Sequence, residues 1–160
     1  MNINAILSFV ISYRDHPDLT LWVVTPAVNN ISLATLVTEF ESEEQFDLIG
    51  GYGGLLPQLN NFGPLDRYYL GEFEVGSYYQ KYGGIDLLGC GHCGEVGCWP
   101  LKCQVKIKGN SVVWHNFLQP HRRDRSYSSF GPFVFELAQY KEAVRKMCAD
   151  LKKRLIADIS

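Results

Sequence analysis

The chain has 160 residues, of which 46% are hydrophobic and 20% are charged, and its formal net charge is −2 at pH 7. This composition is typical of a globular domain, and no stretch approaches the roughly 20 apolar residues of a membrane-spanning helix. The length predicts a single domain, residues 1–160, with one core. Because the N-terminus lacks the basic segment, apolar run and small-residue cleavage site of a secretory signal, we expect a cytoplasmic protein.

The net charge hides a division along the chain. Residues 1–100 carry three basic and twelve acidic side chains, a net charge of −9, whereas residues 101–160 carry twelve basic and five acidic ones, a net charge of +7. Such a division indicates either two interaction surfaces or two segments that neutralise each other in the folded chain.

The N-terminal region predicts a β-hairpin followed by a helix. Residues 2–13 and 19–25 are rich in Ile, Val, Leu and Phe and are separated by a polar break. Ser32 is a helix-capping residue, and the apolar side chains that follow it recur at helical spacing, so we expect a helix that ends near Phe46.

The last turns of this expected helix concentrate negative charge. Carboxylates there lie unfavourably against the helix dipole, so they predict an acidic surface suited to binding a basic partner. The residues are Glu39, Glu41, Glu43, Glu44 and Asp47.

Residues 50–84 are rich in glycine and tyrosine, and their turn-forming residues predict an irregular segment. The glycines at positions 50–54 are not followed by the Lys-Ser/Thr pair or the immediate helix of a nucleotide-binding loop. They therefore favour a helix stop and a turn over a phosphate site.

The C-terminal part predicts a second hairpin and a second long helix. Residues 101–108 and 111–117 alternate around Gly109-Asn110, a pair suited to a two-residue turn. From Glu136 onward, apolar residues recur every three or four positions. The whole pattern indicates an α+β fold in which two antiparallel hairpins form a sheet packed by two helices, with an irregular middle.

Four of the five cysteines lie within fourteen positions, at Cys90, Cys93, Cys98 and Cys103. Cys90-x-x-Cys93 followed by glycine resembles a metal knuckle, and four thiolates would complete a structural zinc site. A histidine, His92, His115 or His121, is an alternative fourth ligand. Inert thiols and a redox pair at Cys90 and Cys93 are the other interpretations that the spacing permits.

A second candidate surface is basic. The loop from His121 to Arg125 mixes arginines with nearby aromatic residues, and Lys102, Lys106 and Lys108 alternate along an expected strand. Because the whole chain is slightly acidic, with a pI near 6.1, nucleic acid is the less favoured partner.

Several segments resemble an uncharacterised family of small bacterial proteins, over roughly residues 33–145. The similar segments are Gly51-Tyr-Gly-Gly-Leu55, the cysteine segment Leu88–Leu101 with its Gly-Cys-Trp-Pro-Leu end, Val113-Trp114, Gln119-Pro-His-Arg122 and Phe130-Gly-Pro-Phe-Val-Phe135. The resemblance implies a bacterial setting and a similar organisation of the chain. It implies no activity.

These features together favour a protein that works by binding another protein. A small acidic chain without a complete catalytic template is what an immunity protein or antitoxin against a basic toxin can look like. The alternative is a metal-dependent or thiol enzyme centred on residues 90–103, with Glu95 or His115 as the acid or base.

Overall fold

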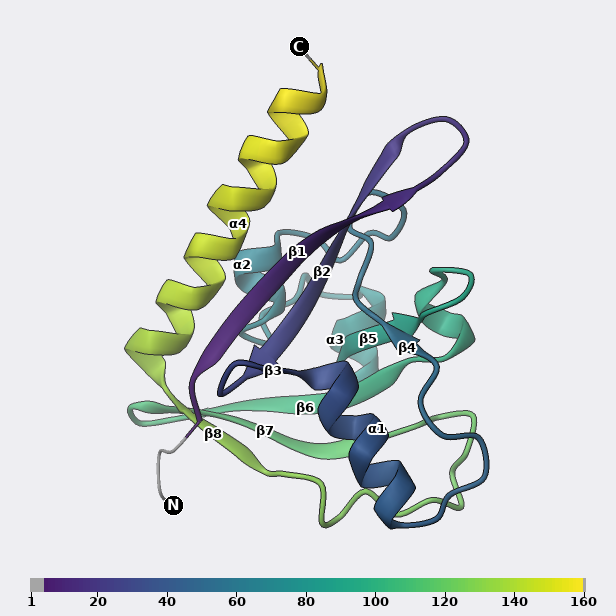
Figure 1. Cartoon of the computed structure of the whole chain (residues 1–160). Helices are drawn as coiled ribbons and strands as arrows, with labels where there is room; N and C mark the ends of the chain where they lie inside the picture. Colours follow the sequence, from purple (N-terminus) through teal and green to yellow (C-terminus); the bar gives the residue numbers. More distant parts are fainter. Residues whose placement is uncertain (1–4, 160) are drawn as a thin grey trace.

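The computed structural model describes residues 5–159, which form an α+β fold (Figure 1). Its strands are β1 (Leu7–Asp15), β2 (Thr20–Val28), β3 (Ile31–Ser32), β4 (Tyr52–Gly53), β5 (Ile85–Cys90), β6 (Leu101–Lys108), β7 (Ser111–Leu118) and β8 (Phe133–Glu136). Its helices are α1 (Leu33–Glu43), α2 (Leu65–Tyr68), α3 (Tyr78–Tyr82) and α4 (Leu137–Ile159), with a 3-10 turn at Val96–Cys98. Within residues 5–159, no helix has the length and apolar character needed to cross a membrane.

Strands β1 and β2 form the predicted N-terminal hairpin. They pair without interruption from Leu7 opposite Val28 to Asp15 opposite Thr20. The expected hairpin began at residue 2, and positions 2–4 lie outside the described residues. Asn29 and Asn30 adopt left-handed backbone angles, with φ of 52° and 65°, and form the two-residue turn that folds β3 back on β2.

Strands β6 and β7 form the predicted second hairpin around Gly109 and Asn110, with Lys108 opposite Ser111. Strand β8 pairs with β7 on one side of this hairpin. Strands β5 and then β4 add to the other side, which gives a five-stranded antiparallel sheet in the order β4-β5-β6-β7-β8.

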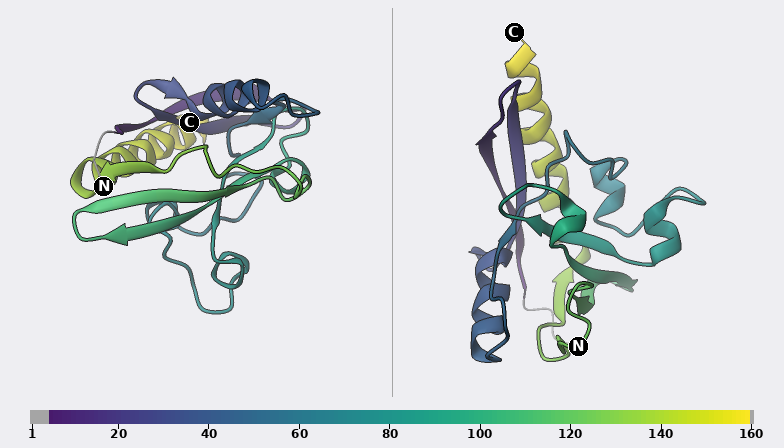
Figure 2. Two further views of the ribbon diagram at one scale, coloured as in Figure 1. Left: turned by 90° about the horizontal axis from the view of Figure 1, so that it is seen from below. Right: turned by 90° about the vertical axis from the view of Figure 1, so that its right-hand side faces the viewer.

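The two hairpins therefore lie in different sheets, and the expectation of one shared sheet is corrected. Because β5 and β8 occupy both edges of the second hairpin, the first hairpin has no edge there to join. Backbone hydrogen bonds still connect the layers: Ala5 N–H donates to Val134 C=O at 3.1 Å, and Val24 and Leu55 exchange two bonds of 2.8 Å. Figure 2 shows the three-stranded sheet with α1 as one layer and the five-stranded sheet as another.

Helix α1 ends at Glu43, three residues earlier than Phe46. Gln45 adopts a left-handed conformation with φ of 57°, which reverses the chain just after the last turn. Helix α4 is the predicted long C-terminal helix, and it packs against β1 (Figure 1). Its buried side chains, Tyr140, Val144, Met147 and Leu151, form the stripe expected from the sequence.

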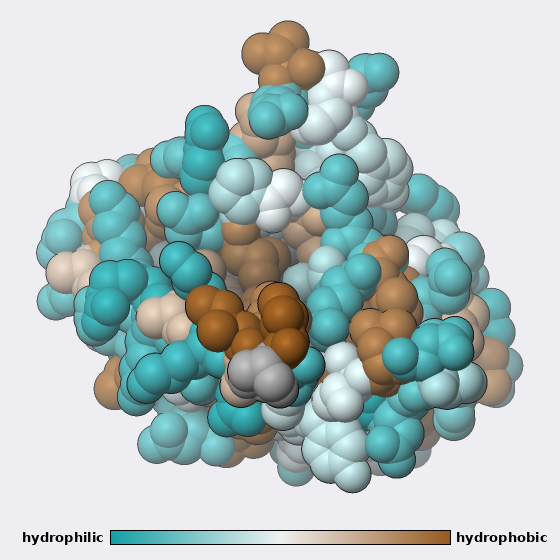
Figure 3. Space-filling model, turned by 90° about the horizontal axis from the view of Figure 1, so that it is seen from above, coloured by the Kyte–Doolittle hydropathy of each residue, from teal (hydrophilic) through white to brown (hydrophobic). Residues whose placement is uncertain are grey.

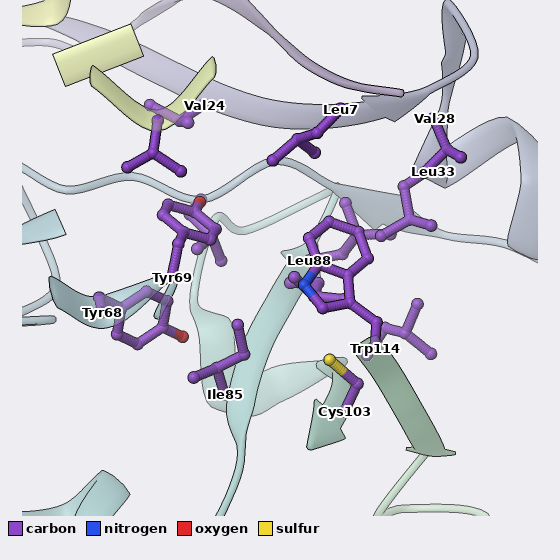
Figure 4. Close-up of a cluster of buried hydrophobic side chains, with 14 of the residues drawn as sticks. Leu7, Val24, Val28, Leu33, Tyr68, Tyr69, Ile85, Leu88, Cys103 and Trp114 are labelled. Atoms are coloured by element: carbon purple, nitrogen blue, oxygen red, sulfur yellow. The ribbon is translucent and has the colours of Figure 1, made fainter. Parts of the chain in front are cut away.

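The core lies between the two sheets and α4, and Trp114 is fully buried in it (Figure 4). The indole N–H of Trp114 donates to the hydroxyl of Tyr140 at 3.0 Å. The Tyr140 hydroxyl in turn donates to the backbone carbonyl of Tyr69. A buried polar chain thus joins β7, α4 and the residue after α2, and each donor in it has an acceptor.

The last turns of α4 extend beyond the core. Figure 3 views the molecule from the end at which α4 terminates, and apolar atoms gather there. Ile156 is 57% exposed and Ile159 is 86% exposed, whereas Leu151, two turns earlier, is 6% exposed. Full burial along α4 therefore ends near Leu151, although its last turns still contact β2: the Trp22 indole donates to Asp158 at 2.7 Å, and Arg154 lies 4.9 Å from the Trp22 ring centre.

We expect Leu151→Asp to lower the free energy of unfolding by about 3 kcal/mol or more, because it places an unpaired carboxylate in the core. Ala149→Asp is the matched control, since it introduces the same charge at an exposed position of the same helix. Urea denaturation measures both. Equal midpoints for the two variants would contradict the docking of α4.

Candidate metal centre and acidic surface

The sulfur atoms of Cys90, Cys93 and Cys98 all lie within 4.8 Å of one another. Three thiolates around a zinc ion, each at 2.3 Å in tetrahedral geometry, are separated by about 3.8 Å, so small side-chain movements bring these sulfurs to ligand spacing. Soft thiolate donors suit zinc better than calcium or magnesium. The three cysteines can therefore hold a metal ion.

The knuckle geometry arises from the residues between and after the first two cysteines. The backbone N–H of Cys93 donates to the Cys90 sulfur at 3.5 Å, and the N–H of Gly94 donates to the Cys90 carbonyl at 3.1 Å. Gly94 has a φ of 79°, and a Cβ at this position would lie 2.6 Å from Cδ1 of Leu56. Glycine is thus required for both the backbone angle and the available space.

Cys98 reaches the other two sulfurs because the chain turns back at Glu95. The Glu95 carbonyl accepts a hydrogen bond from the N–H of Cys98 at 3.2 Å and another from the N–H of Cys90 at 3.3 Å. This shared acceptor brings the end of β5 close to the 3-10 turn at Val96–Cys98.

Three contacts tie this cysteine loop, residues 90–99, to the rest of the molecule. Arg14 of β1 donates to the His92 carbonyl. Gly91 N–H donates to Gly51 C=O, and the Trp99 indole donates to Gly50 C=O, each at 2.9 Å. In the glycine-rich run of residues 50–54, Gly50 and Gly51 adopt positive φ angles, as the predicted turn requires, and the next two residues form β4 beside the cysteines.

The thiols have unequal acidities. Desolvation acts to raise the pKa of Cys90, but backbone hydrogen bonds from Cys93 and His92 outweigh it and lower that pKa to about 7. Hydrogen bonding to the sulfurs of Cys93 and Cys90 is the main cause that raises the pKa of Cys98 to about 11. The lowered pKa of Cys90 favours the thiolate form that metal binding requires.

Cys103, the predicted fourth ligand, is not part of this group, and its assignment is corrected. It lies on β6 opposite Ile85, is 1% exposed and points into the core beside Trp114 (Figure 4). Burial raises the pKa of its thiol well above the ordinary value. Its position on the strand turns the side chain toward the core, away from the loop that the strand follows.

The predicted histidine and carboxylate alternatives do not complete the group either. Among residues 5–159, no His, Asp or Glu joins the three sulfurs within the same distance, and this includes His92, His115 and Glu95. The ring of His121 contacts the cysteine loop at Gly97, with Nε2 2.8 Å from the carbonyl oxygen. All five cysteines are free thiols, so no disulfide links Cys90 to Cys93.

Four of the five predicted acidic residues are exposed, but Glu41 is fully buried. Its carboxylate accepts hydrogen bonds from Gly50 N–H at 2.8 Å, from Tyr52 at 2.7 Å and from Tyr127 at 2.6 Å. Arg125 lies 3.4 Å away and forms a buried ion pair with it. Glu41 faces the interior of the protein, so its assignment to a partner-binding surface is corrected.

The same arginine shapes the loop that follows α1. The second guanidinium nitrogen of Arg125 donates to the Leu48 carbonyl at 2.6 Å, and the guanidinium lies 4.9 Å from the ring centre of Phe46. Leu48 has a left-handed φ of 60°, which is strained for a leucine. Leu48 is nevertheless 55% exposed, and the next residue, Ile49, is 47% exposed.

The other exposed carboxylates of the predicted set precede this apolar pair in the sequence, at Glu39, Glu43, Glu44 and Asp47. We call these six residues the acidic surface. Sequence reasoning identified its charges and missed Leu48 and Ile49, because a leucine in a left-handed conformation has no sequence signal.

The predicted basic patch is also divided by the fold. Lys106 and Lys108 are exposed, but Lys102 is buried and forms an ion pair with Asp86 at 2.7 Å. The extra residue of the register shift lies on β7, so the three lysines keep the shared face expected on β6. Lys102 is withdrawn from the patch because Asp86 and the rings of Tyr78 and Tyr82 cover it. With Arg125 also buried, no continuous basic stripe remains on these elements.

Comparison of the chain with protein-family models, curated proteins and solved structures gives no match. The resemblance to a family of small bacterial proteins therefore stays a prediction.

We expect protein supplied with zinc to bind about one ion per chain, and Cys90→Ser, Cys93→Ser or Cys98→Ser to abolish that binding. Cys103→Ala is the matched control, because it removes a thiol from the core and leaves the three sulfurs in place. Native mass spectrometry measures the bound metal. A chain that binds no zinc, or a Cys103→Ala variant that loses it, would contradict the three-sulfur site.

Proposed function

We propose that this protein works by binding a basic protein partner through the acidic surface, and that a structural zinc ion at Cys90, Cys93 and Cys98 stiffens the loops behind that surface. The specific form of the proposal is an immunity protein or antitoxin that neutralises a basic toxin. Its location in the cytoplasm of a bacterium belongs to the same proposal.

The exposed conformation of Leu48 is the observation that carries the proposal. A leucine in the left-handed region costs free energy, on the order of 1 kcal/mol or more, and here the buried Arg125 holds it there. Keeping Leu48 and Ile49 exposed to solvent therefore lowers the stability of the fold. Binding interfaces typically combine such an apolar centre with a charged rim.

The charge of the surface suits a basic partner. Glu39, Glu43, Glu44 and Asp47 are all exposed, and none of them forms an ion pair within residues 5–159. Unpaired charges of one sign accelerate the approach of an oppositely charged protein, and salt screens this attraction. We therefore expect these four carboxylates to raise mainly the rate of association with the partner.

The cysteine loop supports this surface from behind. Trp99 directly follows Cys98, and its indole holds the Gly50 carbonyl, one residue after Ile49. A zinc ion bound by three thiolates would fix the position of Cys98 and, through Trp99, the end of the acidic surface. In this role the metal supplies folding free energy and no chemistry.

The test begins with affinity capture on immobilised wild-type protein, followed by kinetic analysis of any captured basic protein. Neutralising the four carboxylates, as Glu39→Gln, Glu43→Gln, Glu44→Gln and Asp47→Asn, should lower the association rate constant by about tenfold and flatten its salt dependence. Leu48→Ala should instead raise the dissociation rate constant by about tenfold. Surface plasmon resonance at several ionic strengths measures both constants.

Two controls make this test specific. Replacing Lys106 and Lys108 by glutamine neutralises exposed charges on β6 and should leave both rate constants nearly unchanged. Cytochrome c, a generic basic protein, should show the charge effect but no effect of Leu48→Ala. The proposal fails if neutralising Arg122 and Arg123 weakens binding more than neutralising the four carboxylates does.

A further inference from the structure

A cavity of about 920 Å³ lies between the segment that contains α3 and the cysteine loop. One wall comes from residues 60–82, which include α3, and the other comes from residues 96–100 and 120–123. Figure 2 shows α3 standing away from the two sheets. This space is separate from the acidic surface, since none of the six residues of that surface lines it.

The α3 wall presents an aromatic platform. The rings of Tyr78 and Tyr82 are stacked, with their centroids 5.5 Å apart and their planes 26° from parallel. Tyr78 is 58% exposed and Tyr82 is 39% exposed, although both line the cavity. Two stacked rings left in water offer apolar surface to a planar ring.

The opposite wall carries positive charge. Arg123 is exposed and forms no ion pair with any described residue. His121, on the same wall, is oriented by the contact of Nε2 with the Gly97 carbonyl and stacks on Trp99 at 6.3 Å. A nitrogen that contacts a carbonyl carries the proton, so Nε2 is already engaged within the protein and is not free to donate to a ligand.

The other charges on the lining are mostly neutralised. At the floor, Lys102 pairs with Asp86 at 2.7 Å, and its ammonium lies 4.2 Å from the ring centre of Tyr82. At the rim, Arg67 lies 3.6 Å from Glu72. Glu74 is the lining carboxylate without a cation partner in residues 5–159, and it lies on the segment that leads into α3.

We propose that this cavity binds a planar aromatic anion, with the ring on Tyr78 and Tyr82 and the anionic group on Arg123. The stacked tyrosines would contact the aromatic ring of the ligand, and the unpaired arginine would bind its negative charge. At the floor, the two carboxylate oxygens of Asp86 accept from Lys102 and from the hydroxyl of Tyr79, each at 2.7 Å, so the ammonium of Lys102 is the polar group of the pair that faces a ligand. A buried ion pair is costly to maintain, so its position on a cavity wall favours a binding role over a stabilising one.

Phenyl phosphate is the probe that tests this site, because it combines one ring with one anionic group. Titration of the full-length protein, followed by ¹H–¹⁵N correlation spectra, should give saturable shifts at the amides of Ser77, Tyr78 and Gly97, with a dissociation constant of about 1 mM. Arg123→Ala and Tyr78→Ala should each weaken binding by about tenfold. Arg145→Ala is the matched control, since this exposed arginine pairs with Glu142 on α4 and should not affect binding.

Two further probes separate the contribution of the aromatic ring from that of the negative charge. Inorganic phosphate, which lacks the ring, and benzylamine, which carries the opposite charge, should each bind at least about tenfold more weakly than phenyl phosphate. The proposal is overturned by the absence of saturable shifts, by equal binding of inorganic phosphate or benzylamine, or by an Arg145→Ala variant that loses as much affinity as Arg123→Ala. Because no residue of the acidic surface is probed, failure here leaves the proposed protein binding untouched.

Discussion

The buried ion pair between Glu41 and Arg125 joins two distant segments of the chain, and ring contacts of Phe40 and Phe46 with Tyr127 reinforce the same junction. Glu41 comes from α1, and Arg125 comes from the loop between β7 and β8, 84 positions later. Through hydrogen bonds to Gly50, Tyr52 and Leu48, the same two side chains fix the loop after α1 and the start of β4. The acidic surface and the support of the cysteine loop both depend on this arrangement.

The two buried ion pairs account for a small part of the uneven charge of the chain. Glu41 with Arg125 and Asp86 with Lys102 each pair an acidic residue of the first 100 positions with a basic residue of the last 60. Removing one partner of such a pair typically costs about 3–5 kcal/mol, because the other charge is left buried and unpaired. Part of the division of charge is therefore used inside the fold, and Glu39, Glu43, Glu44 and Asp47 of the exposed remainder belong to the acidic surface.

The sequence predicts the local features of this structure, but it does not predict the features that depend on long-range contacts. Both hairpins and the buried stripe of α4 follow from alternation, turn residues and helical spacing, all of which are local. The separation into two sheets, the burial of Glu41 and the position of Cys103 depend on contacts between distant segments. In the sequence, Glu41 is one of five neighbouring acidic residues and nothing distinguishes it from the others. It is buried because it pairs with Arg125, and no rule of sequence spacing connects these two residues. The knuckle of Cys90 and Cys93 was predictable because its ligands are close in the chain.

Hydrogen exchange of a Glu41→Gln variant tests most directly whether this ion pair organises the site. The substitution keeps the shape of the side chain and removes the charge that faces Arg125. We predict that the amides of residues 45–50 and 97–99 exchange at least about tenfold faster than in the wild type, while those of the β1–β2 hairpin are unchanged. Unchanged exchange at residues 45–50 and 97–99, or uniformly faster exchange throughout the chain, would contradict the account.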